Sequence, residues 1–157
     1  MLTEQDRQKL IEAIRRLPED LASAVDSLSD GELDTPYRDG GWTPRQVVHH
    51  LADSHLNAFV RMKLMLTEDR PTLKPYNQDA WAATKDCAGM PVSPSIAILT
   101  GLHERWVALL KSVPADAWAR TAFHPEDGDV TLEGLLKTYA KHGERHLQHI
   151  LSVRRGR

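Results

Sequence analysis

The chain has 157 residues, of which 41% are hydrophobic and 27% are charged, a composition typical of a globular domain large enough to bury a core. Its formal net charge is −2 and its lysines and arginines are scattered, so we expect no nucleic-acid partner, because such proteins carry a basic patch. No apolar run approaches the roughly 18 residues that a membrane span needs, so we expect no membrane partner. The simplest interpretation is one domain over residues 1–157.

The first predicted helix follows Thr3 and Asp6, which fit a loose N-cap pattern, and its apolar residues recur at helical spacing as far as Leu28. Pro18 lies within this pattern, and we expect it to kink or restart the helix. The Gly- and Asp-rich segment 29–41 predicts an ordered connection with tight turns.

The second predicted helix has the strongest start in the chain. Thr43 can cap it, Pro44 suits its first position, and Gln46 completes a capping box. The helix should run to about Thr67, and its apolar residues cover much of its circumference, so we expect it to be central. Residues 68–92 are proline-rich and predict a long connection with one short helix near Gln78–Thr84, suited to shaping a site or an interface.

A third helix is predicted from Ser93 to an end at Pro114, and residues 120–130 could form a small hairpin around Gly128. Thr131 can cap the last long helix, and its end is predicted at Gly156, after two arginines. These elements predict an all-α four-helix bundle with a long ordered connection after the second helix and a small hairpin before the last.

Histidine is the unusual feature of the composition, because two short stretches hold six of the eight. His142, His146 and His149 stand at i, i+4 and i+7, which places all three on one face of a helix. Two imidazoles at i, i+4 can converge on one metal ion, but a catalytic zinc usually has three protein ligands. A third ligand must therefore come from another helix.

His50 is the leading candidate for that third ligand. It shares a stripe with Ser54 and Asn57 in an otherwise apolar helix, and buried polar groups need partners. Two alternatives stay open, which are a pair of His146 with His149 and a pair of His49 with Asp53.

The other reactive side chains carry weaker signals. His55 lies five residues after His50, off its face, so we interpret it as peripheral, and His103 and His124 have no spaced partners. The lone Cys87 cannot form an intramolecular disulfide and has no neighbours that mark an activated thiol. Together with a polar start that lacks a signal-peptide pattern, Cys87 predicts a cytoplasmic protein.

Three histidines without a carboxylate would leave the full charge of a divalent ion on the site. That charge favours a bound water of lowered pKa or a bound thiolate, and hence a hydrolase or a transferase. Gly143, between two of the proposed ligands, costs helix stability and could admit a close neighbour or a substrate.

The run from Asp34 to Asn57, with its Gly-Gly-Trp-Thr-Pro and His-His-Leu-Ala-Asp motifs, resembles the YfiT branch of the DinB-like superfamily. Similar matches extend through Lys74-Pro-Tyr76, Leu102–Trp106 and Phe123-His-Pro125, so the resemblance covers nearly the whole chain. Members of this branch are described as metal-dependent hydrolases and as bacillithiol S-transferases.

The resemblance implies a four-helix bundle, a homodimer and one divalent metal per subunit, zinc or nickel, held by His50, His142 and His146. Relatives are often richer in histidine in the last motif, whereas Gly143, Glu144 and Arg145 stand there in this chain. The following residues are candidates to lie around the ligands: Asp53, Ser54, Asn57 and His149.

Three functions are compatible with this sequence. The first is a metal-dependent transferase that joins a low-molecular-weight, bacillithiol-like thiol to an electrophilic substrate. The second is a metal-dependent hydrolase that uses metal-bound water, with Asp53 or Glu144 as a conceivable general base. The third is a non-catalytic stress-response bundle whose histidines are structural.

Overall fold

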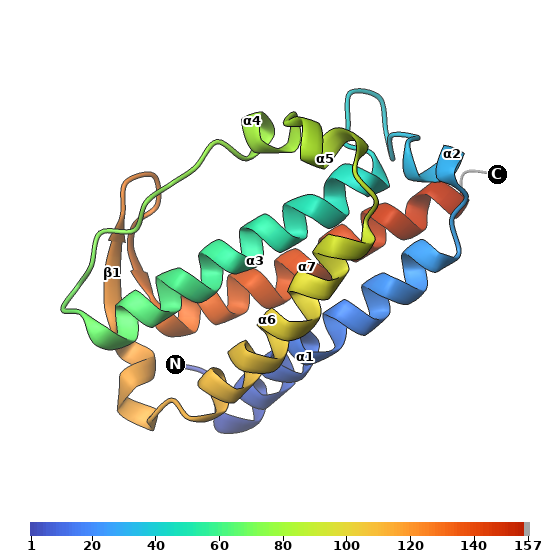
Figure 1. The fold of residues 1–157 in the computed structure, drawn as a ribbon. Helices are drawn as coiled ribbons and strands as arrows, with labels where there is room; N and C mark the ends of the chain where they lie inside the picture. The colour runs from blue at the N-terminus through green and yellow to red at the C-terminus, as the bar shows by residue number, and fades with distance from the viewer. Residues whose placement is uncertain (156–157) are drawn as a thin grey trace.

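Four long helices dominate the computed structural model, which describes the backbone of residues 1–155 and the side chains of residues 1–153 (Figure 1). They are α1 (Glu4–Asp26), α3 (Pro44–Thr67), α6 (Ser93–Lys111) and α7 (Leu132–Arg155). Helices α1 and α3 each pack against both α6 and α7, so α1 and α3 lie diagonally across the bundle. The predicted four-helix bundle is therefore confirmed, and two of its three connections join diagonal helices.

The helix starts form as the sequence predicts. The hydroxyl of Thr43 accepts from the backbone N–H of Gln46 at 3.2 Å, and the Gln46 side chain accepts from the N–H of Thr43 at 3.0 Å. At α7 the Thr131 hydroxyl accepts from the N–H of Gly134 at 3.0 Å. Each bond satisfies a donor that the first helical turn leaves unpaired. The predicted end of α7 at Gly156 lies outside the described residues.

Of the two outcomes expected at Pro18, a kink or a restart, the restart is wrong, because α1 is one helix from Glu4 to Asp26 with Pro18 inside it. Proline removes one bond of the helical ladder and leaves the carbonyl of Ile14, four residues earlier, without its usual donor. The side chain of His103 on α6 bonds that carbonyl instead. A neighbouring helix thus replaces the missing bond.

The connections contain more regular structure than the sequence suggests. Between α1 and α3 lies the short helix α2 (Asp30–Leu33), and residues 68–92 hold α4 (Gln78–Ala82) and α5 (Lys85–Gly89), where one short helix was predicted. Helix α6 ends at Lys111, three residues before Pro114, and a 3-10 turn, η1 (Ala115–Ala119), follows.

The predicted hairpin is present as β1 (Thr121–His124) and β2 (Gly128–Thr131), an antiparallel pair in which Thr121 faces Thr131 and His124 faces Gly128. Gly128 has a φ of 75°, a conformation that glycine adopts without strain. The hairpin leads directly into α7, and it lies at the end of the bundle away from α2 (Figure 1).

The core consists of two apolar clusters separated by histidines. One cluster surrounds Trp106 and Met62, and the other surrounds Leu21 and Leu51. Between them lies the histidine layer, whose members come from α3, α6 and α7: His50, His55, His103, His142 and His146. Within the described chain, no helix is long and apolar enough to cross a membrane.

Candidate metal centre

Three histidines converge where the first half of α3 faces α7. His50, His142 and His146 each offer a ring nitrogen, and these three atoms lie within 4.8 Å of one another. The Nε2 atoms of His50 and His142 are 3.1 Å apart. Two imidazoles bound to one tetrahedral zinc at about 2.0–2.1 Å place their nitrogens roughly 3.4 Å apart, so the observed spacing fits a shared ion.

Helix α7, which carries His142 and His146, packs closely on α1. A Cβ atom on Gly143 would lie 2.5 Å from Cδ2 of Leu17, a separation that real structures do not show. Gly143 therefore lets α1 approach α7 closely, and the neighbour that its missing side chain admits is Leu17. His142 precedes this glycine directly, and His146 lies one helical turn after His142 on the face toward α3.

Burial keeps the three rings neutral. Desolvation lowers the pKa of His50 to about 4, that of His142 to about 3 and that of His146 to about 2. Arg145 acts in the same direction on all three rings, a proton on one ring would oppose a proton on the next, and Asp79 acts in the opposite direction on His50. A neutral imidazole keeps the lone pair that a metal needs. The Nδ1 atom of His146 is buried and has no hydrogen-bond partner among the described residues.

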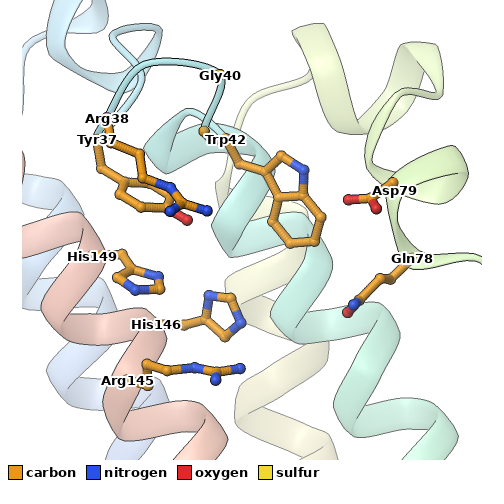
Figure 2. Close-up of a pocket in the computed structure, with 10 residues that line it drawn as sticks. Tyr37, Arg38, Gly40, Trp42, Gln78, Asp79, Arg145, His146 and His149 are labelled. Atoms are coloured by element: carbon orange, nitrogen blue, oxygen red, sulfur yellow. The ribbon is translucent and has the colours of Figure 1, made fainter.

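A cavity of about 510 Å³ opens beside His146 (Figure 2). Its lining comes from the connection before α3, from α4 and from α7: Tyr37, Arg38, Gly40, Gly41, Trp42, Gln78, Asp79, Arg145, His146 and His149. Two guanidinium groups and one carboxylate therefore face this space, which makes its wall net positive when the histidines are neutral.

Aromatic rings fix the shape of this cavity. The Trp42 ring lies 4.6 Å from that of His50 and is nearly parallel to that of His146 at 6.2 Å. Tyr37 stacks on His149 with a centroid distance of 4.3 Å and an interplanar angle of 4°. These contacts tie residues of the preceding connection to the histidines of α3 and α7, and they leave His149 in the wall of the cavity.

A sequence profile of the DinB superfamily matches residues 7–150. The chain belongs to the DinB superfamily. It is 43% identical over 155 residues to a Bacillus subtilis protein named "Putative metal-dependent hydrolase YfiT", covering 98% of this chain and 87% of that protein. A Bacillus mycoides protein with the same descriptive name is 48% identical over 154 residues, covering 98% of this chain and 88% of the relative.

Solved structures agree with this family. The structure of Bacillus subtilis YfiT, described as a probable metal-dependent hydrolase with an unusual four-helix bundle topology, has a TM-score of 0.96 at 43% identity. The match covers 99% of this chain and 89% of that one. A mycothiol-dependent maleylpyruvate isomerase, with a TM-score of 0.59 at 17% identity over 96% of this chain and 63% of its own, shares the fold alone.

Of the residues predicted to surround the ligands in this DinB chain, only His149 lines the cavity. The carboxylate of Asp53 instead accepts from the Cys87 thiol at 3.7 Å, and burial raises the pKa of both groups. Ser54 is buried and hydrogen-bonds Tyr76, and the Asn57 amide donates to a backbone carbonyl of its own helix at 2.9 Å. After His50, the residues Ser54 and Asn57 of the same stripe on α3 therefore do not line the cavity.

The alternative pair of His49 and Asp53 is not assembled as a metal site in the structure. The His49 ring bonds the Ser95 hydroxyl at 2.7 Å and the Met90 carbonyl at 3.2 Å, so protein partners use both of its nitrogens. Cys87 is buried, and its raised pKa keeps the thiol protonated, in agreement with an unactivated cysteine.

The interpretation of His55 as peripheral is wrong. Its side chain is fully buried, and its Nε2 lies 3.4 Å from Nδ1 of His142, one of the three converging histidines. Sequence reasoning also missed His103, which is buried on α6 and lies 2.9 Å from His55. Three and four residues before and after His55 stand apolar residues, namely Leu51, Ala52, Ala58 and Phe59, so a polar side chain on an apolar helix face was the available signal.

Proposed function

We propose that this DinB protein is a metal-dependent transferase that joins a low-molecular-weight thiol of the bacillithiol type to an electrophile. The observation that supports it most is that His146 belongs both to the three-histidine group and to the wall of the positively charged cavity. The relative YfiT is named as metal-dependent, and we extend that dependence to this chain, with zinc or nickel as the ion.

The ligand set would hold such an ion through three neutral imidazoles, with no carboxylate among them. A divalent ion held this way would lower the pKa of a thiol or a water molecule that reaches it. The remaining task of the protein is to bind the thiol, to orient the electrophile and to limit access of water.

The cavity wall suits an anionic thiol that also carries an amine. Arg38 and Arg145 present planar guanidinium groups that pair with carboxylates, and Asp79 can pair with an ammonium group. Trp42 and Tyr37 form an apolar wall against which an electrophile with an aromatic or aliphatic body can pack. A conjugating enzyme needs both kinds of surface in one cavity.

Hydrolysis is the second candidate, and the presence of the carboxylate of Asp79 in the cavity wall favours it. A hydrolase needs a general base near the metal, but Asp53 bonds Cys87 and Glu144 is exposed outside the cavity lining. Asp79 does line the cavity, although no motif or spacing in the sequence marks it. In a hydrolase, Asp79 would be the base.

The test uses purified protein loaded with zinc or nickel, bacillithiol as the thiol and monochlorobimane as the electrophile. We expect conjugation that disappears in His146→Ala. Arg145→Gln should raise KM for bacillithiol and leave KM for 2-mercaptoethanol unchanged, because the latter has no carboxylate.

Thiol-independent hydrolysis of an ester or amide probe, lost in both His146→Ala and Asp79→Asn, would replace the transferase proposal with the hydrolase. Failure of the purified protein to retain metal after supplementation, with no change in melting temperature on adding a chelator, would remove both and leave the structural bundle. The homodimer expected from the resemblance stays a prediction that light scattering can check.

A further inference from the structure

Pro18 leaves a backbone acceptor free in the interior of the bundle. Because proline has no N–H, the carbonyl of Ile14 cannot receive the usual bond from position 18. Both residues are buried, so water cannot easily replace that donor. The Nδ1 atom of His103 lies 2.6 Å from the Ile14 oxygen and supplies the missing bond from α6.

From this carbonyl, a line of imidazoles leads to the metal centre. Nε2 of His103 lies 2.9 Å from Nδ1 of His55, and Nε2 of His55 lies 3.4 Å from Nδ1 of His142. We call His103, His55 and His142 the histidine series. The rings of His55 and His103 stack with a centroid distance of 5.0 Å and an interplanar angle of 8°, and both are buried. The line connects four helices, starting at α1 and ending on α7.

The donors and acceptors along the series can alternate in one direction only. A carbonyl oxygen accepts and never donates, so Nδ1 of His103 must carry the proton. In a neutral ring Nε2 is then bare, and it must accept from Nδ1–H of His55. The same step repeated once more leaves Nε2 of His55 bare, to accept from Nδ1–H of His142.

This order gives His142 the tautomer that a metal ligand needs. With the proton on Nδ1, the lone pair of His142 is on Nε2, the atom that lies 3.1 Å from Nε2 of His50. A protonated His55 would donate from both of its nitrogens and force the His142 proton onto Nε2, where it would block the ion. The neighbours of the His55 ring are Trp106 and Tyr139 and the other histidines, with no carboxylate among its contacts in the described structure.

We propose that His103 and His55 are positioning residues that hold His142 in its Nδ1–H tautomer, anchored on the Ile14 carbonyl that Pro18 leaves free. The proposal rests on the three-histidine site of the proposed function, but not on which reaction occurs there. Partners of this kind fix the orientation of a ligating imidazole, and removing one typically lowers metal affinity about 10–100-fold.

The first test reads the tautomers directly in the unmodified, metal-free protein by NMR of ring-labelled histidines. We expect protonated Nδ1 and bare Nε2 at both His103 and His55. A proton on Nε2 of either ring would overturn the proposal: at His103 it would leave the Ile14 carbonyl without its donor, and at His55 it would donate to Nδ1 of His142 and so place the proton of His142 on Nε2. This measurement requires no variant to fold.

The second test measures zinc affinity by competition with a chromophoric chelator. His55→Leu should lower the affinity about 10–100-fold, and His55→Gln, whose amide oxygen can accept from His142, should recover part of the loss. His124→Leu is the matched control, because His124 is buried on β1 outside the series and should leave the affinity unchanged. Circular dichroism of each metal-free variant checks its folding.

Pro18→Ala tests the anchor from a helix that carries no ligand. It returns an N–H to the Ile14 carbonyl, so we expect a weaker bond from His103 and a fall in zinc affinity smaller than that of His55→Leu. Unchanged affinity in both His55→Leu and Pro18→Ala would refute the inference and leave the metal site intact. If the unmodified protein bound no zinc or nickel, the proposed function would fail at the same time.

Discussion

Gly143 gives the sharpest test of how the bundle positions its histidines. Replacing this glycine by alanine inside α7 should by itself stabilise the helix by about 1 kcal/mol. The added Cβ, however, would lie 2.5 Å from Cδ2 and 3.3 Å from Cδ1 of Leu17, which is itself 5% exposed and cannot turn into solvent. Overpacking of this kind costs about 1–3 kcal/mol, so we expect Gly143→Ala to be neutral to destabilising.

A matched substitution isolates the contact. Gly101 lies inside α6, and a Cβ added there meets no atom within 4 Å, so Gly101→Ala should stabilise by about 1 kcal/mol. The two alanine variants should therefore differ by about 1–3 kcal/mol in their free energies of unfolding, measured by urea titration of metal-free protein. Equal stabilisation by both would refute the close packing of α7 on α1.

A double-mutant cycle then identifies the partner. Leu17→Ala alone should cost about 2–5 kcal/mol, because Leu17 is buried in an apolar cluster. In that background Gly143→Ala no longer meets the Cδ atoms and should become stabilising by about 1 kcal/mol. A coupling energy near zero would show that the alanine is accommodated by something other than displacement of Leu17.

Three further predictions concern other parts of the fold. Burial lowers the pKa of His103 from 6.5 to about 4, so the unfolded chain binds its proton more readily. The contribution of His103 to stability should be full above pH 6.5 and fall by about 3 kcal/mol toward pH 4, which the difference between urea titrations of the unmodified protein and of His103→Leu across that range would show. Thr43→Ala should cost about 1 kcal/mol through loss of the cap of α3, whereas Thr43→Ser should cost little, by the same titration. Arg45 donates hydrogen bonds to both carboxylate oxygens of Asp34 and to the Met90 carbonyl. Arg45→Ala should therefore lower the free energy of unfolding by about 1 kcal/mol and speed proteolysis near Asp34, and Asp34→Asn should change both quantities less.

The features that the sequence predicts well have local causes. The start of α3 depends on Thr43, Pro44 and Gln46, which interact within a single turn. The convergence of His142 and His146 follows from a spacing of four residues on one helix. Each of these predictions needs only the geometry of one helix, so it can be made without knowing how the helices pack.

The features that the sequence does not predict depend on how separate elements pack against one another. The spacing along α3 shows that His55 lies off the face of His50. It does not show how α6 and α7 are rotated, and these rotations bring His103 and His142 against His55. Asp79 and Trp42 line the cavity because of the paths of two long connections, which no periodic pattern encodes. Pro18 predicts a kink or a restart of the first helix, because the sequence of one helix does not show a hydrogen-bond donor that comes from another helix.

The histidines in the core and those that line the cavity differ in their hydrogen bonding. Toward the core, His103 bonds Ile14, and His55 bonds His103 and His142, so protein partners use all of their ring nitrogens. Nδ1 of His146, a member of the layer that also lines the cavity, is buried without a partner among the described residues, and so is Nδ1 of His149 in the cavity wall. Buried polar atoms without partners are costly, so an added group that pairs with them is favoured. Among the described residues, the buried histidine nitrogens without a partner therefore belong to two residues of the cavity wall, which Arg38, Asp79 and Arg145 also line.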